Sequence, residues 1–521
     1  MNLSLTKKMD TRRAFLSRTA CASMGVTGMV NALAQIRLMN LAVAADPPPG
    51  TDDYKALVCV FLGGGNDANN MLVPMGDPAS DEARRDYEAA RGNLVQPRAG
   101  LHSLNLPVAA PDVPTRAFQK YYGGAFPQMG IHPNARPLAD MFNAGDLAFV
   151  TNVGTLVHPI ASRADFINRT VPVPMGLFSH SDQQVQWQSS ISDKPFSSGW
   201  GGRVADLINA SYNQGGKISM SVAMTGLNSF QSGSGDGVEQ YIIGQDGPVS
   251  LGSYGLNYKF AYNIPGDVTG GYINSALGRQ LKAFEDIMRL THDQLLEERY
   301  NEFVRQARNT EGVVAAGLAA AAATGVNFDS YFANAQTPLG NYLKMAARII
   351  AGRAPLGNRR QVFFIYVSGF DNHSGMLAAH SGLMADVSQA LLSFRNALKA
   401  PAINAFDKVV TFTASDFART LLSNGSGSDH AWGSHSIIMG GGVKGRNLYG
   451  HYPALKLGGQ PGSIDSHSGR GLLIPDVSVD QYAAVLANWF GVQSSAMDAI
   501  LPNLPHFDNP LTTSTANLGL F

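Results

Sequence analysis

Aspartate and histidine side chains follow several short apolar runs of this sequence, and together they have the chemistry of a metal site. Asp67, Asp371 and Asp416 each end or closely follow such a run. His373 comes two residues after Asp371, and His430 lies in a Gly/Ser-rich segment soon after Asp416. Crowded carboxylates repel one another unless protons or cations compensate, and mixed Asp/His ligation suits Zn²⁺ or Mn²⁺ better than Mg²⁺. We predict that these side chains bind Zn or Mn, although a single Asp at a loop start is also common turn chemistry.

The apolar runs predict the elements that position these side chains. Continuous runs at 56–62, 147–151, 362–367, 409–413 and 437–439 are typical of strands buried on both faces of a parallel sheet. Helical patterns cover 338–351, 377–398 and 479–490. Strands that alternate with helices predict an α/β three-layer sandwich with a mostly parallel central sheet. Ligands bind beyond the carboxyl ends of the strands in such sheets, where the predicted ligands fall.

The stretch 225–335 differs from its surroundings. It begins rich in Gly, Ser and Asn, continues through a long helical pattern at 277–308 and passes an alanine-rich run at 315–323. We interpret it as a helical insertion in one α/β domain spanning 46–521, and not as a second catalytic domain.

The first 45 residues have the layout of an export signal. Arg12-Arg13 precedes Phe15-Leu16, and a moderately apolar stretch follows at 19–34. The stretch at 41–45 then ends in small residues that suit a signal peptidase. A paired arginine belongs to the twin-arginine variant of such signals; the alternative is an amphipathic N-terminus that happens to contain Arg-Arg. We expect a periplasmic or secreted protein that meets the twin-arginine translocase during export. The apolar stretch is too polar for a stable membrane anchor.

Composition excludes several classes of protein. Hydrophobic residues make up 45% and charged residues 15% of the chain, which favours a large core over disorder. The formal net charge is +0 and no basic stripe is present, so we expect no nucleic-acid partner. Beyond the signal only Cys59 remains, so no internal disulfide is possible, and its apolar neighbours predict a buried strand residue.

Several motifs resemble those of the exported "domain of unknown function 1501" family, which belongs to the alkaline-phosphatase-like superfamily. They are GGNDANN at 64–70, SHSDQQ at 179–184, GFDNH at 369–373, SDFART at 415–420 and DHAWG at 429–433, followed by GGVKG at 441–445 and VDQY at 479–482. The resemblance implies a hydrolase or transferase that acts on phosphate or sulfate esters with two metals. The family itself has no general assigned activity.

The resemblance also implies metal roles for the residues named above. Asp67 resembles an aspartate that binds one metal, Asp371 and His373 resemble the Asp/His pair of the other metal, and Asp416 and His430 resemble the later ligands. Three departures are visible. The Asp371–His373 spacing is short, and Phe417 stands where the superfamily places a ligating His. At the nucleophile, Ala164-Asp165 follows Arg163 where family members tend to have Ser-His.

Ser162 and Thr155 are the candidate nucleophiles, because the superfamily places a hydroxyl at a helix N-terminus after the second strand, where free N–H groups bind an anion. A serine that merely caps a helix is the alternative for Ser162. Arg419 has the planar fork that clamps phosphate or sulfate oxygens, and pairing with Asp416 is its alternative.

Polar residues at 180–188 are candidates for substrate binding. Amides and an indole suit a sugar or a polar organic group, and the alternative is a loop that packs its Trp into the core. The predicted substrate-binding residues are His180, Asp182, Gln183 and Trp187. We expect the glycine-flanked His435, His451 and His467 on the surface or behind the ligands. The Gly63-Gly64-Gly65 run is not a dinucleotide loop, because the G-x-G-x-x-G pattern fails at Ala68.

These observations predict an exported metal-dependent hydrolase-like protein that acts on a small anionic ester, either a phosphate or a sulfate. The alternative is a non-catalytic periplasmic binding or assembly protein that retains the fold.

Overall fold

The computed structural model describes residues 53–106, 114–123, 127–235, 237–248, 261, 263, 271–288, 310–466, 469–511 and 518–521. The predicted export signal at 1–45 and part of the predicted insertion therefore lie outside the described residues. In the part of the chain that is described, no helix has the length and apolarity needed to cross a membrane.

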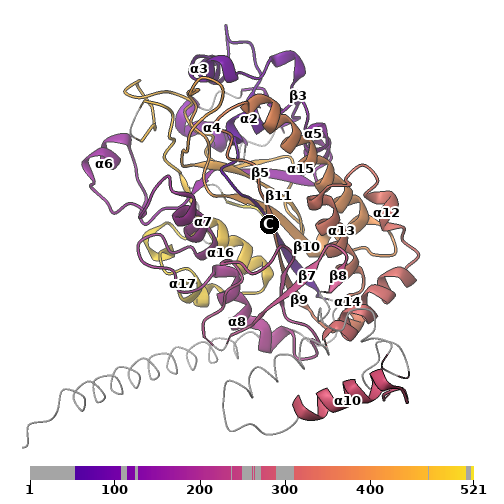
Figure 1. The fold of residues 1–521 in the computed structure, drawn as a ribbon. Coiled ribbons are helices and arrows are strands. Elements are labelled where there is room, and N and C mark those ends of the chain that lie inside the picture. The colour runs from indigo at the N-terminus through magenta and orange to yellow at the C-terminus, as the bar shows by residue number, and fades with distance from the viewer. Residues whose placement is uncertain are drawn as a thin grey trace, which may run out of the picture.

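A 10-stranded sheet, counted over the described residues, forms the centre of the molecule in the order β12-β5-β11-β10-β1-β9-β6-β7-β8, with β13 beside β5 (Figure 1). β1 lies between β10 and β9 and is parallel to both, whereas β11 is antiparallel to both of its neighbours. The predicted mostly parallel sheet is confirmed. The strands are β1 (Lys55–Leu62), β5 (Leu147–Gly154), β6 (Ser221–Ala223), β7 (Gln240–Gly244), β8 (Gly247–Pro248), β9 (Arg360–Val367), β10 (Val409–Ser415), β11 (Ser434–Gly440), β12 (Leu448–Gly450) and β13 (Val477–Ser478).

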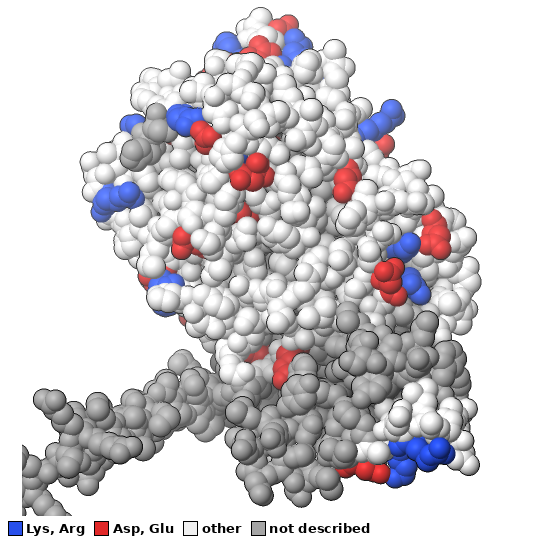
Figure 2. All heavy atoms as spheres, viewed as in Figure 1, with Lys and Arg blue, Asp and Glu red and all other residues white. Residues whose placement is uncertain are grey.

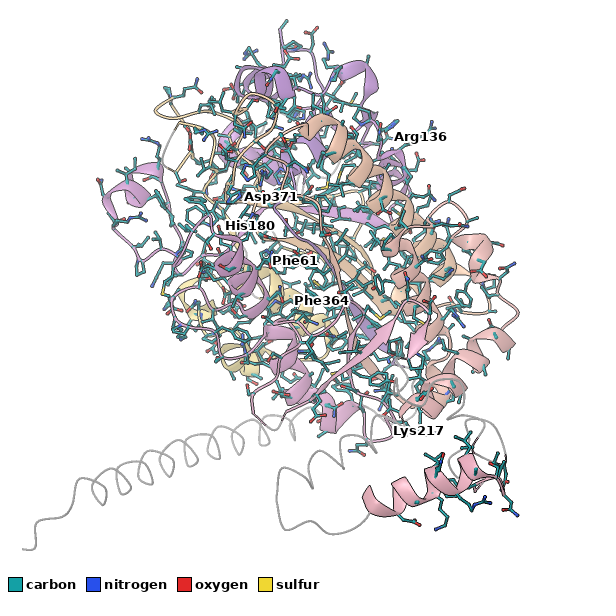
Figure 3. All side chains as sticks on the ribbon, in the orientation of Figure 1. Phe61, Arg136, His180, Lys217, Phe364 and Asp371 are labelled. Atoms are coloured by element: carbon teal, nitrogen blue, oxygen red, sulfur yellow. The ribbon has the colours of Figure 1, made fainter. Side chains whose placement is uncertain are left out.

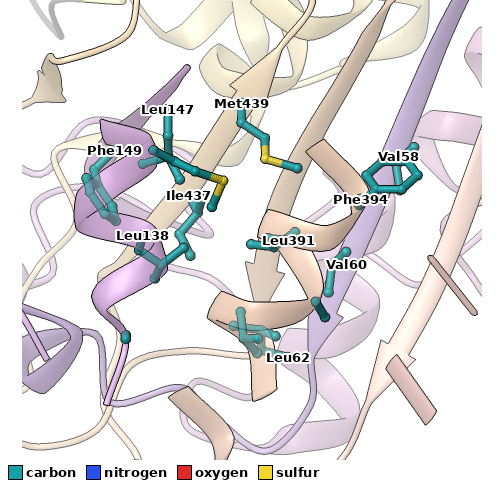
Figure 4. Packing of buried hydrophobic residues seen from close by; sticks show 14 of the residues in the cluster. Val58, Val60, Leu62, Leu138, Leu147, Phe149, Leu391, Phe394, Ile437 and Met439 are labelled. Carbon is teal, nitrogen blue, oxygen red and sulfur yellow. The ribbon is translucent and has the colours of Figure 1, made fainter. Parts of the chain in front are cut away.

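Helices cover both faces of this sheet (Figure 1). One face packs against α5 (Arg136–Asn143), α13 (Pro338–Ala351) and α15 (Met376–Lys399), and the other against α7 (His180–Ser189), α8 (Trp200–Tyr212) and α16 (Val479–Phe490). Because successive strand residues point to opposite faces, Val58, Val60 and Leu62 join the α15 side, as Figure 4 shows, while Cys59 and Phe61 join the other. The arrangement has three layers, and Cys59 is buried as predicted.

A smaller sheet lies near the carboxyl end of β1. It contains β2 (Leu72–Pro74), β4 (Met129–Ile131) and β3 (His102–Ser103), and it follows the single turn α2 (Ala68–Met71). Further α-helices in the described residues are α3 (Glu82–Arg91), α4 (Pro114–Tyr122), α6 (Arg163–Asn168), α10 (Ala276–Met288), α12 (Phe328–Tyr331), α14 (Arg353–Leu356) and α17 (Met497–Ile500).

The stretch 225–335 is joined to the main domain through the sheet. Its strand β7 pairs in parallel with β6, which in turn pairs with β9. Of the helix predicted at 277–308, the structure describes α10, and the rest falls outside the described residues. The described part of this stretch therefore extends the central sheet as well as adding helix.

Charged side chains are scattered over the face drawn in Figure 2, and no patch of Lys and Arg gathers on it. This distribution accompanies the net charge of +0.

Candidate metal centre

The ends of β1, β9 and β10 meet at a glycine turn that follows β1. Gly64 has φ +114, a conformation that other residues rarely adopt, and a Cβ atom there would lie 2.4 Å from the backbone nitrogen of Asp371. Its own N–H donates to Asp416 Oδ1 at 3.1 Å. The absence of a side chain at Gly64 thus lets the loops after the three strands come together.

Four side chains converge in front of this turn, and we call them the His/Asp cluster: His180, Asp371, His373 and His430. Asp371 places Oδ2 3.4 Å from His180 Nε2, and its Oδ1 lies 3.4 Å from His430 Nε2 and 3.0 Å from His373 Nε2. The Nε2 atoms of His373 and His430 are 3.0 Å apart. Figure 3 shows Asp371 beside His180, which begins α7.

Each imidazole of the cluster is oriented through its other nitrogen. His180 Nδ1 lies 2.7 Å from Asp416 Oδ2, and Asp416 is fully buried. His430 Nδ1 lies 2.7 Å from the carbonyl oxygen of Phe178, and His373 Nδ1 lies 3.0 Å from Asp429 Oδ1. When each imidazole is neutral and donates through Nδ1 to these oxygens, each Nε2 turns a lone pair toward the cluster.

This donor set fits a divalent metal ion. His180 Nε2 is buried without a hydrogen-bond partner, and the facing Nε2 atoms of His373 and His430 carry no proton to share when each Nδ1 donates. Burial lowers the pKa of His430, which favours the neutral imidazole that a metal requires. In the described residues, ligand atoms of His180, Asp371 and His430 all lie within 4.8 Å of one another. Imidazole nitrogen with one carboxylate is a typical ligand set for Zn²⁺.

Arg419 lies behind Asp371 and is fully buried. Its Nη1 donates to Asp371 Oδ1 at 2.7 Å and to the Gly64 carbonyl at 3.2 Å, and its Nη2 donates to the carbonyl of Ser428. Although partial burial opposes it, this guanidinium holds the pKa of Asp371 below its usual value. Arg419 therefore pairs with Asp371, and the alternative pairing with Asp416 is wrong.

Asp67 lies outside the group of converging ligand atoms. It is buried and forms an ion pair with Arg91 at the end of α3, and Arg91 Nη1 also donates to the carbonyl oxygens of Thr420 and Leu421 at 2.9 and 3.2 Å. Burial raises the pKa of Asp67 while Arg91 opposes that rise. A guanidinium thus lies where the resemblance implies a further metal. Asp416 is also not one of the converging ligands, and it contacts the cluster through its hydrogen bond with His180 Nδ1.

The two candidate nucleophiles form their hydrogen bonds elsewhere. Ser162 is exposed and caps α6, since its Oγ accepts from the Asp165 N–H at 3.2 Å and lies 2.7 Å from Asp165 Oδ2. Thr155 is buried and accepts from Gln183 Nε2 at 3.3 Å. The capping alternative for Ser162 is the one that the structure shows.

The predicted substrate-binding residues separate into different roles. His180 belongs to the cluster, while the buried Gln183 accepts from the Phe178 N–H at 2.6 Å and so supports the carbonyl that holds His430. Trp187 is in the core, with its ring 6.3 Å from Phe61, which is the alternative considered for it. Asp182 is exposed and lies against Gly176.

The sequence analysis placed Gln184 in the candidate substrate-binding stretch at 180–188, but it did not predict that Gln184 and Asp429 hold other residues of the site. Gln184 Nε2 donates to Asp416 Oδ2 at 2.8 Å, and Asp429 holds His373 and forms an ion pair with Arg470. The spacing of four residues between His180 and Gln184 on a helix was the available signal for Gln184. Asp429 was adjacent to the predicted His430, but nothing in the sequence separated the two roles.

Of the three histidines expected on the surface or behind the ligands, the structure describes His435 and His451. His435 is 4% exposed and accepts from the Asn152 N–H at 3.1 Å, and burial lowers its pKa to about 3. The expectation of a surface position is wrong for His435, because it lies within β11, which is covered on both faces. His451 is partly buried, and His467 lies outside the described residues.

Residues 270–464 match the model of a protein family described as "Protein of unknown function (DUF1501)". This match supports the resemblance to that family. The matched stretch includes Asp371, His373, Arg419 and His430, but not His180, which completes the cluster from α7. No curated protein matches the chain.

Solved structures that are similar to this chain include two of one other protein. The crystal structure of Ps i-CgsB in complex with k-i-k-neocarrahexaose has 10% identity and a TM-score of 0.29, and the crystal structure of Ps i-CgsB has 11% identity and a TM-score of 0.27. Each alignment covers 88% of this chain and 77% of the other. At these TM-scores, neither likeness bears on fold or function.

Proposed function

We propose that the chain is an exported hydrolase with an alkaline-phosphatase-like sheet that cleaves small phosphate or sulfate esters at one divalent metal ion. The observation that carries the proposal is the convergence of three imidazole Nε2 atoms on Asp371 while every Nδ1 is held by an acceptor. Neutral lone pairs and a carboxylate that face one another are stable when a cation lies among them.

His180, Asp371, His373 and His430 would hold the ion, with Zn or Mn favoured over Mg. When bound, the ion polarises an ester oxygen and lowers the pKa of water. The residues behind the cluster keep the ligands in place. Asp416 holds His180, and Arg419 holds Asp371.

One ion is proposed in place of the two that the resemblance implies, because Arg91 already neutralises Asp67. Both side chains are buried, and a second divalent ion at Asp67 would lie beside a guanidinium that it repels. Arg419 adds a further buried positive charge that influences Asp67.

The charges around the cluster favour an anionic substrate. Asp371, Asp416 and Asp429 are offset by Arg419 and Arg470, so a divalent ion leaves the group net positive. Ser162 caps a helix and Thr155 is buried, so we propose that water attacks the ester. The new bond joins the water oxygen to phosphorus or sulfur, the bond to the ester oxygen breaks, and the leaving alkoxide takes the proton that the water gives up.

Metal content of the mature protein, purified without chelator, tests this function. Inductively coupled plasma mass spectrometry on wild type should find about one Zn or Mn per chain, and the Asp371→Ala/His430→Ala variant should lose it. Asp182→Ala is the matched control, because Asp182 is exposed outside the cluster. A screen against phosphate and sulfate monoesters then assigns the ester. Folded wild-type protein without metal would overturn the proposal and leave a binding or assembly protein that retains the fold.

A further inference from the structure

A pocket of about 260 Å³ opens beside the candidate metal centre, and we call it the α7 pocket. Its walls come from one side of α7, from the loop at 225–229 and from the end of β9. No lining residue is charged. The lining includes Gln184, Gln188, Thr225, Leu227, Phe364 and Tyr366.

The α7 pocket and the His/Asp cluster share one face of α7. His180, Gln184 and Gln188 follow one another at intervals of four residues, so they lie along the same side of the helix over about 12 Å. Gln184 joins the two regions, since its Nε2 donates to Asp416 Oδ2 at 2.8 Å and to the Tyr366 hydroxyl at 3.4 Å. Figure 3 shows Phe364 and Phe61 following His180 and Asp371 along the sheet.

Tyr366 is fixed at the boundary between pocket and cluster. Its ring stacks on Phe61 at 5.9 Å, and its backbone N–H donates to Thr225 Oγ1 at 2.9 Å. A Cβ atom at Gly63 would lie 2.1 Å from the Tyr366 hydroxyl oxygen, so the glycine makes room for the phenol. The hydroxyl accepts from Gln184 and keeps its own hydrogen for a ligand.

The pocket offers both hydrogen bonds and apolar surface. Amide and hydroxyl groups come from Gln184, Gln188 and Tyr366, while Leu227 is 75% exposed at the rim. A charged group placed here would lose water without gaining an ionic partner, and a wholly apolar group would leave the hydroxyl hydrogen of Tyr366 without an acceptor. The volume is below the range of about 300–1,000 Å³ that is usual for drug-sized ligands, so it suits a single ring.

We propose that the α7 pocket binds the uncharged organic part of the substrate, a hydroxyl-bearing ring such as one sugar unit, whose phosphate or sulfate ester group reaches the His/Asp cluster. The inference rests on the proposed function. It identifies Leu227 and Tyr366 as residues that determine specificity.

Steady-state kinetics with glucose 6-phosphate and glucose 6-sulfate, beside methyl phosphate and methyl sulfate, test the inference. Leu227→Asp places a charge at the pocket rim and should raise KM for the accepted sugar ester at least tenfold, with kcat changed less than twofold. The methyl ester should be unaffected, because it does not reach the pocket. Ile167→Asp, at an exposed apolar position on α6, is the control and should leave KM and kcat unchanged for both the sugar ester and the methyl ester.

Calorimetric binding of methyl glucoside separates this inference from the proposed function, because the neutral sugar does not need the metal. Wild type and Ile167→Asp should bind it, and Leu227→Asp should bind it at least tenfold more weakly. If wild type purified without chelator contains no metal and still binds the glucoside, the binding would support the pocket and the missing metal would overturn the hydrolase. Equal KM changes for sugar and methyl esters, or no binding of the glucoside to wild type, would overturn the pocket inference whatever the metal content.

Discussion

At the scale of single residues, the candidate site depends on the acceptors behind its imidazoles. Asp416 is buried, holds His180 Nδ1 and also accepts from Gly64 and Gln184. Carboxylates that hold a metal-binding histidine fix its tautomer and raise its basicity. The cluster is therefore built from both the ligand atoms and the oxygens that orient them.

Asp416→Asn keeps the shape of the side chain but removes its negative charge. We expect the affinity for Zn²⁺ to fall about 10–100-fold, because His180 loses its charged acceptor. Competition with a chromophoric chelator measures this change. Asp182→Asn, on the exposed side of α7, should leave the affinity within twofold. Equal affinities in Asp416→Asn and wild type would show that His180 is not a ligand.

Arg91 and Asp67 form a buried ion pair, so removal of one partner leaves an uncompensated charge. We expect Arg91→Met to lower the free energy of unfolding by about 3–5 kcal/mol. The double variant Arg91→Met/Asp67→Asn should recover a large part of that loss. Urea unfolding of both variants and of Asp67→Asn provides the comparison. If Arg91→Met alone is as stable as the double variant, the pair does not neutralise Asp67 as we infer.

At the scale of elements, the site depends on how closely the loops after β1, β9 and β10 approach. Gly64 lies at the contact point, with a positive φ and its Cβ direction blocked by the Asp371 backbone. α7 then adds His180 from outside the sheet and carries Gln184 and Gln188 along the same side. One helix face therefore serves both the cluster and the α7 pocket.

Gly64→Ala should displace the loop that carries Asp371. The added Cβ would be 2.4 Å from a backbone nitrogen, so the loop must shift, and the positive φ adds strain. We expect a loss of about 1–3 kcal/mol in stability together with loss of the metal. Gly459→Ala is a suitable control, since no atom lies near its Cβ position and its φ is ordinary. Full metal content in Gly64→Ala, measured by mass spectrometry, would contradict this account of the turn.

At the scale of the whole molecule, the core contains ionisable groups that make stability depend on pH. Burial raises the pKa of Asp480 in α16 to about 7, although the Ser190 hydroxyl opposes the rise. The unfolded side chain titrates near 3.8. Between about pH 4 and pH 7 the folded state therefore binds more protons than the unfolded state, and stability falls as pH rises through this window.

Asp480→Asn should remove that pH dependence. Wild type should lose up to about 1.4 kcal/mol per pH unit from this group between pH 4 and pH 7, and nothing further above pH 7. The variant should therefore match wild type near pH 4 and exceed it by about 2–4 kcal/mol at pH 8. Urea unfolding at pH 5 and pH 8 measures the difference. If the free energy of unfolding of the variant exceeds that of wild type by the same amount at pH 5 and pH 8, Asp480 is charged in the folded state at both pH values.

Export belongs to the whole precursor and is a proposal from the sequence at 1–45. Replacing Arg12 and Arg13 by Lys should abolish transport by the twin-arginine translocase, so that uncleaved precursor accumulates in the cytoplasm. Immunoblots of cell fractions detect the change. Arg18→Lys is the matched control and should be exported normally. Normal export of the Lys-Lys variant would exclude the twin-arginine route.

The sequence by itself determined five of the strands, three helices and the position of several site residues. Continuous apolar runs predicted β1, β5, β9, β10 and β11, because strands buried on both faces contain few polar residues. Asp371, His373 and His430 were predicted because they follow such strands or lie in the loops beyond them. Local pattern was sufficient for these features.

Only the tertiary structure decided which polar groups pair. Asp67 meets Arg91, Arg419 meets Asp371, and His180 reaches the cluster from α7, which is 191 positions before Asp371 in the chain. Charge partners separated in sequence have no spacing that local periodicity can detect. Which charged residues pair depends on the loops that the strand order brings together and on how little room Gly64 occupies between these loops.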